Sequence, residues 1–321
     1  MPAILHAYHV TKTGKAVKLD PENYTLRPEK NGFVWLHFDR KDPATEAFFE
    51  KDDSIDMVVS QNLCADDSRP RTILHDGDIL LNLRGVNLHE GSEPEDMIGI
   101  RFFVQDNRVV SIEKRTLKAT GDIAERLQKR TTPLTPGGFI AGFANALVDR
   151  MAPTITDLNE QVDELEERID QIDAVKSRGN LSELRRDAIM LRRYLAPQRD
   201  ALNTLSQQQV SYITADNQLS IREAADQATR VTEELEAIRE RCAIVKDQLT
   251  DMRAEEMNRN MMILSVVAAI FLPLGLISGM FGINVGGMPW TETGSGFWLV
   301  TAIVLIIAII QLIVFKILKW I

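Results

Sequence analysis

Two charge-free apolar runs near the C-terminus constrain this chain more than any other feature. Met261–Met280 (MMILSVVAAIFLPLGLISGM) and Phe297–Phe315 (FWLVTAIVLIIAIIQLIVF) contain no Asp, Glu, Lys or Arg. At a rise of about 1.5 Å per residue, each run as a helix spans the roughly 30 Å hydrocarbon core of a bilayer. The sequence therefore predicts a first transmembrane helix at 261–280 and a second at 297–317. An outer loop at 281–296 joins them, and a short tail follows at 318–321.

The basic residues next to these runs predict the orientation of the chain. Arg253 and Arg259 precede the first run and Lys316 and Lys319 follow the second, whereas the loop has no basic residue and one acid, Glu292. Lys and Arg are enriched on the cytoplasmic side of transmembrane helices, so both termini are predicted to be cytoplasmic. The opening sequence MPAILHAYHV lacks the pattern of a secretory signal peptide.

The composition of the first 260 residues excludes several functions. This part has 45 acidic and 35 basic residues, a net charge of −10, which argues against a nucleic-acid partner and favours cations. Cys64 and Cys242 are far apart, and the five histidines form no zinc-ligand pattern. No nucleophile–base pair or metal-ligand cluster is evident, so the sequence predicts neither an enzyme nor a bound cofactor.

Residues 1–134 are predicted to form an α/β domain with a mixed sheet and helices on its faces. Strand-like runs are bounded by Asp, Gly and Asn, and two of them, around Asp106-Asn107, are predicted to form a hairpin. The helical patterns are TEAFFEK (45–51) and IAERLQKR (123–130). The strand-like runs are FVWLHF (33–38), DILLNLRGVNL (78–88), IGIRFFVQ (98–105) and RVVSIEK (108–114).

Residues 135–216 are predicted to form two long antiparallel helices. Apolar residues spaced by three and four run from Ile155 to Ile172, and a second such seam runs from Leu184 to Leu205. Gly179-Asn180 is predicted to separate the two helices, and Pro197 is predicted to kink the second. Both seams are expected to pack within the chain.

Residues 217–260 are predicted to form a stalk helix that continues into the first span. Its seam runs from Ala224 to Met252, and the helix is predicted to be continuous from about Gln218 to Met280. Because this seam leads directly into a span, we expect it to face copies of itself about a shared symmetry axis.

Acidic residues dominate the stretch from Asp157 to Asp173, where Arg168 is the one basic residue. Such a run is usually a solvated helix face. The alternative interpretation is a diffuse surface that attracts cations, without a ligand cage. The acids are Asp157, Glu160, Asp163, Glu164, Glu166, Glu167, Asp170 and Asp173.

Gly282-Ile283-Asn284 closes the first run, and together with IFLPLGLISGMFGIN it resembles the signature of the CorA family of divalent-cation transporters. That family has Met where this chain has Ile283, and this difference and the following VGGMP are similar to the ZntB-type branch. The strings RPR (69–71), LRGVNL (83–88) and PEDM (94–97) are also similar to that branch, and RRYLAPQRDAL (192–202) to the wider family. The resemblance implies a funnel-shaped homopentamer in the bacterial inner membrane, with the first span lining a central pore.

The resemblance also implies which residues line the pore. In this view Gly282, Ile283 and Asn284 form the selectivity filter. A ring of Asn284 oxygens would bind the outer hydration shell of the cation, and apolar rings further in would gate by dewetting. Stepping back from Asn284 at helical spacing gives the predicted pore-lining and gate residues Met257, Met261, Leu264, Ala268, Leu272, Gly275 and Gly279.

The resemblance alone favours Zn²⁺ as the transported ion, because Asn oxygen and thioethers do not distinguish zinc from magnesium. An alternative interpretation is a channel for Mg²⁺, Co²⁺ or Ni²⁺, and Cd²⁺ is a further candidate ion. An alternative of another class is a non-conducting membrane-anchored scaffold or sensor. The ZntB-type resemblance further suggests stimulation by a proton gradient. Neither span contains an Asp, Glu or His, so protons would move with Glu255, Glu256 or Glu292, or with water.

Overall fold

The computed structural model describes residues 3–20, 32–51, 54–66, 69–130, 134–169, 174–283, 289–290 and 294–318, with backbone alone for 174–178. The chain divides into two compact units, Met1–Val245 and Lys246–Ile321. The first unit contains a sheet and most of the helices. The second contains the two apolar helical segments.

The first unit is built on a seven-stranded mixed sheet with the order β2-β1-β3-β7-β6-β5-β4. Strands β3 and β7 pair in parallel, and the other neighbouring strands pair antiparallel. The predicted hairpin is confirmed as β6 and β7, whereas β1, β2 and β4 were not predicted. The strands are β1 Ile4–Val10, β2 Ala16–Lys18, β3 Phe33–Asp39, β4 Arg71–His75, β5 Asp78–Gly85, β6 Ile98–Val104 and β7 Arg108–Glu113.

Both faces of the sheet are covered, which explains why its central strands are continuous apolar runs. In β3, Phe33 and Trp35 belong to the core under one layer of helices, and Val34 and Leu36 belong to the core under the other. Helices α1 (Pro43–Lys51) and α2 (Met57–Cys64) cover the second face. Helices α3 (Lys118–Lys129) and α4 (Pro136–Asp149) cover the first.

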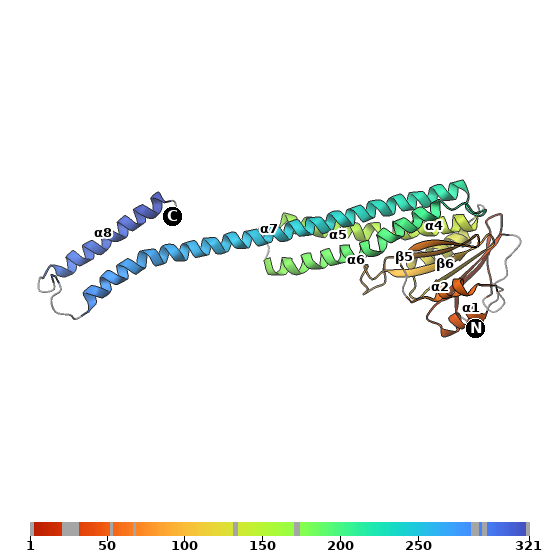
Figure 1. The fold of residues 1–321 in the computed structure, drawn as a ribbon, viewed down its shortest axis with the longest axis horizontal. Helices are drawn as coiled ribbons and strands as arrows, with labels where there is room; N and C mark the ends of the chain where they lie inside the picture. The colour runs from red at the N-terminus through yellow and green to blue at the C-terminus, as the bar shows by residue number, and fades with distance from the viewer. Residues whose placement is uncertain are drawn as a thin grey trace. The chain divides into compact units, whose positions relative to one another are not determined.

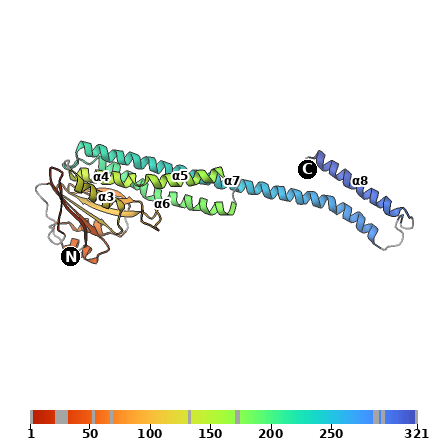
Figure 2. The same ribbon diagram turned by 180° about the vertical axis from the view of Figure 1, so that it is seen from behind.

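Three further helices extend from the layer that contains α4 away from the sheet (Figures 1 and 2). They are α5 (Ala152–Glu167), α6 (Ala174–Ser206) and the first part of α7 (Ala215–Gly282). Asn145 of α4 donates hydrogen bonds to the main-chain and side-chain oxygens of Ser220 in α7, at 3.3 and 3.1 Å. These bonds hold the start of α7 against the helical layer of the sheet.

The break between the first two long helices lies earlier than the sequence predicted. Gly179-Asn180 is inside α6, and α5 ends at Glu167, so the prediction of a break at Gly179-Asn180 was wrong. Gly in a helix interior costs only about 1 kcal/mol relative to Ala, which a long packed helix tolerates. The predicted seam residue Ile169 follows the end of α5, and Ile172 lies outside the described residues.

The apolar seam of α7 packs within the chain, contrary to the prediction that it faces symmetry mates. Leu235 and Ile238 are fully buried in a single chain, and Cys242 and Val245 are 1% and 2% exposed. Arg241 of α7 bonds Asp163 and Glu166 of α5, and Arg192 of α6 lies 3.3 Å from Glu236 of α7. Apolar residues spaced by three and four indicate that one face of a helix is buried, but they do not indicate which element covers that face. Here α5 and α6 of the same chain pack beside α7.

The second unit contains two helices long and apolar enough to cross a membrane. They are the last part of α7, which is continuous to Gly282 as predicted, and α8 (Gly296–Ile317). Helix α7 continues through Pro273, which has no N–H to donate to the main-chain oxygen of Ala269. Gln311 of α8 donates to that oxygen at 3.2 Å. A side chain from the second helix therefore supplies the hydrogen bond that Pro273 removes from the first.

Candidate pore and cation pathway

Helix α8 packs against one face of α7 and leaves the opposite face uncovered. Val266 is 8% exposed, whereas Leu264, two positions earlier and therefore roughly half a turn away, is 69% exposed. Ala269, which accepts the bond from Gln311, and Pro273 are half-buried on the same side as Val266. In this unit α7 thus has a covered face and a free face.

The residues predicted to line a pore all lie on the free face. At about 100° per residue they form one stripe along α7, turned away from the side that includes Val266 and Pro273. Met261 is 58% exposed and Leu272 is 73% exposed. The other members of the stripe, also exposed, are Met257, Leu264, Ala268, Gly275 and Gly279. The stripe is apolar at its N-terminal end and small at its C-terminal end.

The predicted filter begins where α7 ends. Gly282 is the last residue of the helix, and Ile283 follows it as an exposed residue. A Cβ at Gly282 would meet no atom within 4 Å in the described part of the chain. Asn284 and Glu292 lie outside the described residues, so the placement of the filter amide remains a sequence-based prediction.

Within the described ranges, no group of three or more His, Cys, Asp or Glu residues is arranged to hold a metal ion. His75 lies beside two acids, and its Nε2 is 3.9 Å from a carboxylate oxygen of each of Asp56 and Asp76. Zinc–ligand bonds are about 2.0–2.2 Å long for His nitrogen and carboxylate oxygen. The side chains of the α7 stripe are thioether and aliphatic groups, and none of them is a His, Cys, Asp or Glu.

The acidic run of α5 is an exposed helix face that is partly neutralised by one arginine. Hydrogen bonds from Arg241 to Glu166 and Asp163 raise the pKa of the Arg241 guanidinium. Asp157, Glu160 and Glu164 are exposed on the same helix. The arrangement agrees with the interpretation of a solvated face. Asp170 and Asp173 lie outside the described residues.

A polar cluster that the sequence did not predict lies between β3 and β7. Ser111 Oγ is 2.8 Å from both His37 Nδ1 and Trp35 Nε1, and His37 Nε2 is 3.3 Å from Glu113 Oε1. Glu113 also accepts from the hydroxyl of Thr120 at 2.9 Å. Residue types of this kind form catalytic triads, but Ser111 and His37 are fully buried, so no substrate reaches them. The residues are 74 positions apart, and only the parallel pairing of β3 with β7 brings them together.

The relation of this chain to known proteins follows from its sequence and its fold together. The sequence model of the family described as "CorA-like Mg2+ transporter protein" matches residues 30–316, which is most of the chain. The chain belongs to the CorA family. Members of this family transport divalent cations, and this activity agrees with a chain that has two apolar helices and a free stripe on the first.

Two curated relatives and one solved structure resemble nearly the whole chain. "Divalent cation transporter CmaX" of Pseudomonas aeruginosa is 36% identical over 297 residues, covering 92% of this chain and 89% of CmaX. "Zinc transport protein ZntB" of Pectobacterium carotovorum is 30% identical over 295 residues, covering 92% of this chain and 89% of that protein. The solved "full-length CmaX protein" has a TM-score of 0.83 at 33% identity and covers 99% of this chain and 98% of its own.

These similarities confirm the CorA-like fold that the sequence predicted, with a mixed α/β domain, long helices and two C-terminal apolar helices. They also bear on the role of the polar cluster around Ser111. CorA-family members are transporters rather than enzymes. We therefore assign the cluster a structural role, in which His37 and Glu113 connect β3 to β7 and Thr120 connects β7 to α3.

Proposed function

We propose that this CorA-family protein transports Zn²⁺ across the bacterial inner membrane through the central pore of a homopentamer. In this proposal both termini are cytoplasmic, the α7 stripe from Met257 to Gly279 lines the pore, and Gly282, Ile283 and Asn284 form the filter. Zinc is preferred over Mg²⁺ because a relative with 30% identity is named a zinc transport protein.

The observation that supports the pore most strongly is the free face of α7. Helix α8 covers the side of α7 that includes Val266, and the uncovered side is the stripe that includes Leu264 and Leu272. An apolar stripe bordered by glycine suits a ring of identical helices around an axis, because small residues let backbones approach closely. A hydrated cation passes such a ring when the filter binds it through its water shell.

Isotope flux into proteoliposomes tests this proposal. We expect uptake of ⁶⁵Zn²⁺ at fixed voltage that exceeds Mg²⁺ uptake measured under the same conditions. Asn284→Ala removes the ring of amide oxygens and is expected to abolish uptake while the oligomer keeps its mass. Asn258→Ala, the same substitution on an exposed residue away from the stripe, is the matched control and should transport normally.

Three outcomes contradict separate parts of this proposal. Normal flux in an intact Asn284→Ala oligomer would exclude the filter role. Uptake of Mg²⁺ but not Zn²⁺ would assign the ion that the family description prints. A wild-type protein that reconstitutes correctly and conducts no divalent cation would support the scaffold alternative.

A further inference from the structure

A polar cavity of about 180 Å³ lies at one end of the sheet in the first unit. The parallel strands β3 and β7 both finish there, at Asp39 and Glu113, and the residues that follow them line the cavity. Strand β6 begins at the same end with Ile98, opposite the last residue of β5. The crevice beyond the carboxyl ends of parallel strands is a common place for ligands in open α/β sheets.

Positive charge is concentrated around this cavity. The lining includes five cationic side chains and one carboxylate, Asp66, and a second carboxylate, Asp96, is bonded to one of the cations. This concentration stands out because the first 260 residues have a net charge of −10. The five cations come from four segments of the chain and are Arg40, Arg84, Arg101, Lys114 and Arg115.

The innermost cations are held in place by main-chain oxygens. Arg101 is 8% exposed and donates to the carbonyls of Leu63 and Asp66 at 3.3 and 3.4 Å. Arg84 donates to the carbonyl of Met97 at 2.9 Å, and its guanidinium lies 4.0 Å from the ring centre of Tyr194. The guanidinium group of arginine is always protonated in proteins, so both side chains bring a positive charge to the lining of the cavity.

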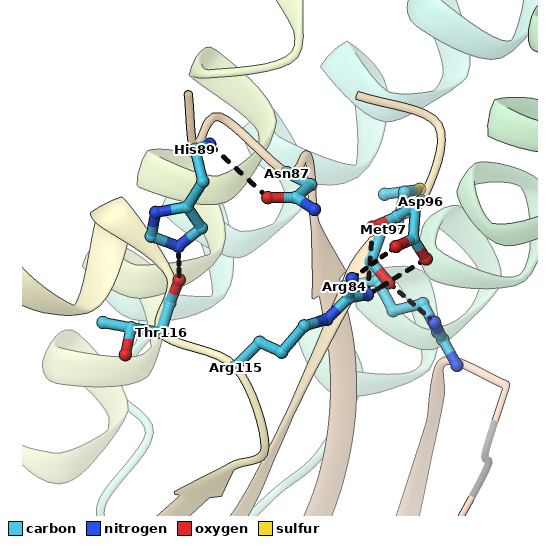
Figure 3. A network of polar contacts seen from close by, with 7 residues as sticks. All are labelled: Arg84, Asn87, His89, Asp96, Met97, Arg115 and Thr116. Carbon is cyan, nitrogen blue, oxygen red and sulfur yellow. Dashed lines mark hydrogen bonds and ion pairs between the residues drawn. The ribbon is translucent and has the colours of Figure 1, made fainter. Parts of the chain in front are cut away.

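The two carboxylates lie at the solvent-exposed rim. The side chain of Asp66 is 90% exposed and accepts a hydrogen bond from Arg40 at 2.8 Å. The side chain of Asp96 is 63% exposed and pairs with Arg115, and Figure 3 shows Arg84 and Arg115 meeting around Asp96 and Met97. These hydrogen bonds lower the pKa of Asp66 and of Asp96, so both acids are charged near neutral pH. Even so, the lining keeps a positive excess.

We propose that this cavity binds a small molecule with a phosphate group. Arginine forks match phosphate oxygens, and a tetrahedral dianion accepts donors from several directions; the cations that line this cavity come from four segments. A single water molecule needs about 10–15 Å³ of cavity volume. The cavity, at about 180 Å³, therefore has room for a phosphate group. This phosphate site lies in the first unit, and the proposal does not depend on which ion is transported.

Calorimetric titration of the purified full-length protein tests the assignment. Inorganic phosphate and AMP are titrated separately at constant ionic strength with EDTA present. We expect saturable binding at one site per chain. Lys114→Glu reverses the charge of a side chain that is 63% exposed. Gly99→Asp places a carboxylate at a lining residue whose Cβ would meet no atom within 4 Å. Each variant should weaken binding about tenfold or more.

A matched control separates a built site from general charge effects. Lys12→Glu makes the same charge change on an exposed residue in the β1–β2 turn. Because β1 is antiparallel to β3, this turn is at the opposite end of the sheet from Asp39. Lys12→Glu should bind phosphate as the wild type does.

Each result of the titration decides the assignment. Tighter binding of AMP than of inorganic phosphate would identify an organic phosphate as the ligand, and the reverse would identify the free ion. Equal loss of binding in Lys12→Glu and Lys114→Glu would overturn the assignment. It would also be overturned if neither phosphate compound gave saturable binding, or if citrate bound and phosphate did not.

Discussion

His6 lies at the border of the buried polar cluster between β3 and β7. Its ring is stacked 5.5 Å from the ring of Trp35 and lies 5.8 Å from that of His37. Burial lowers the pKa of His6 below its usual 6.5, and His37 and Lys18 lower it further, while Glu113 opposes them. The folded state therefore disfavours the protonated form of His6.

This shift predicts a loss of stability in mild acid. Between pH 6.5 and the lower folded pKa, the unfolded chain binds more protons at His6 than the folded chain does, so stability falls as pH falls. His6→Phe keeps an aromatic ring against Trp35 and removes the titration. Thermal unfolding of the full-length protein from pH 7.5 to 5.5 should show a smaller loss in His6→Phe than in the wild type. An equal loss of stability in His6→Phe and in the wild type would contradict the assignment of this pH dependence to His6.

A second residue-scale prediction concerns the amide of Gln311. Gln311→Leu would leave the oxygen of Ala269 without its donor at the α7–α8 contact and should cost about 0.5–1.5 kcal/mol. Pro273→Ala restores the main-chain N–H for the same oxygen, so Gln311→Leu should cost little in that background. Unfolding of the four proteins of this double-mutant cycle in detergent measures the coupling. A cost of Gln311→Leu that is equal in both backgrounds would show that Gln311 does not replace the missing donor.

The elements found from sequence are those whose pattern is complete within one segment. β3, β5, β6 and β7 are long apolar runs because both faces of the sheet are covered, and α7 has neither Pro nor Gly from Gln218 up to Pro273. β4 is an edge strand of only five residues, RTILH, which is too short to show a clear alternation of apolar and polar residues. The partner of the α7 seam and the cluster around Ser111 depend on contacts between distant segments, which no local pattern records.

Charges on the α7 seam test the intrachain packing of that helix. Leu235→Asp with Ile238→Asp places two unpaired carboxylates at fully buried positions, and each should cost several kcal/mol. We expect the helical part of the first unit to unfold, seen as lost helical signal and rapid proteolysis before any effect on assembly. Ile244→Asp, at a position that is 57% exposed on the same helix, is the control and should remain folded. A double variant that is folded but monomeric would restore the interpretation of the seam as a contact between copies.

At the scale of the whole molecule, titratable groups and the apolar spans are separated along the chain. The runs 261–280 and 297–315 contain no titratable residue, whereas Glu255 and Glu256 are exposed on α7 just before the first span. A pore that binds its cation through the hydration shell needs no side chain that exchanges protons. Any proton coupling of transport would then depend on water that moves with the ion.

This separation predicts how transport responds to a pH gradient. Replacing Glu255, Glu256 and Glu292 with Gln removes the carboxylates nearest to the spans and should leave the pH dependence of ⁶⁵Zn²⁺ uptake in proteoliposomes unchanged. The control replaces Glu223, Glu233 and Glu234, three exposed acids of α7 in the first unit, in the same way. If the first triple variant conducted but no longer responded to an imposed pH gradient, while the control responded normally, one of its three carboxylates would be the proton site. The hydrated-pore account of coupling would then be wrong, because water alone would not be sufficient to couple the proton to the ion.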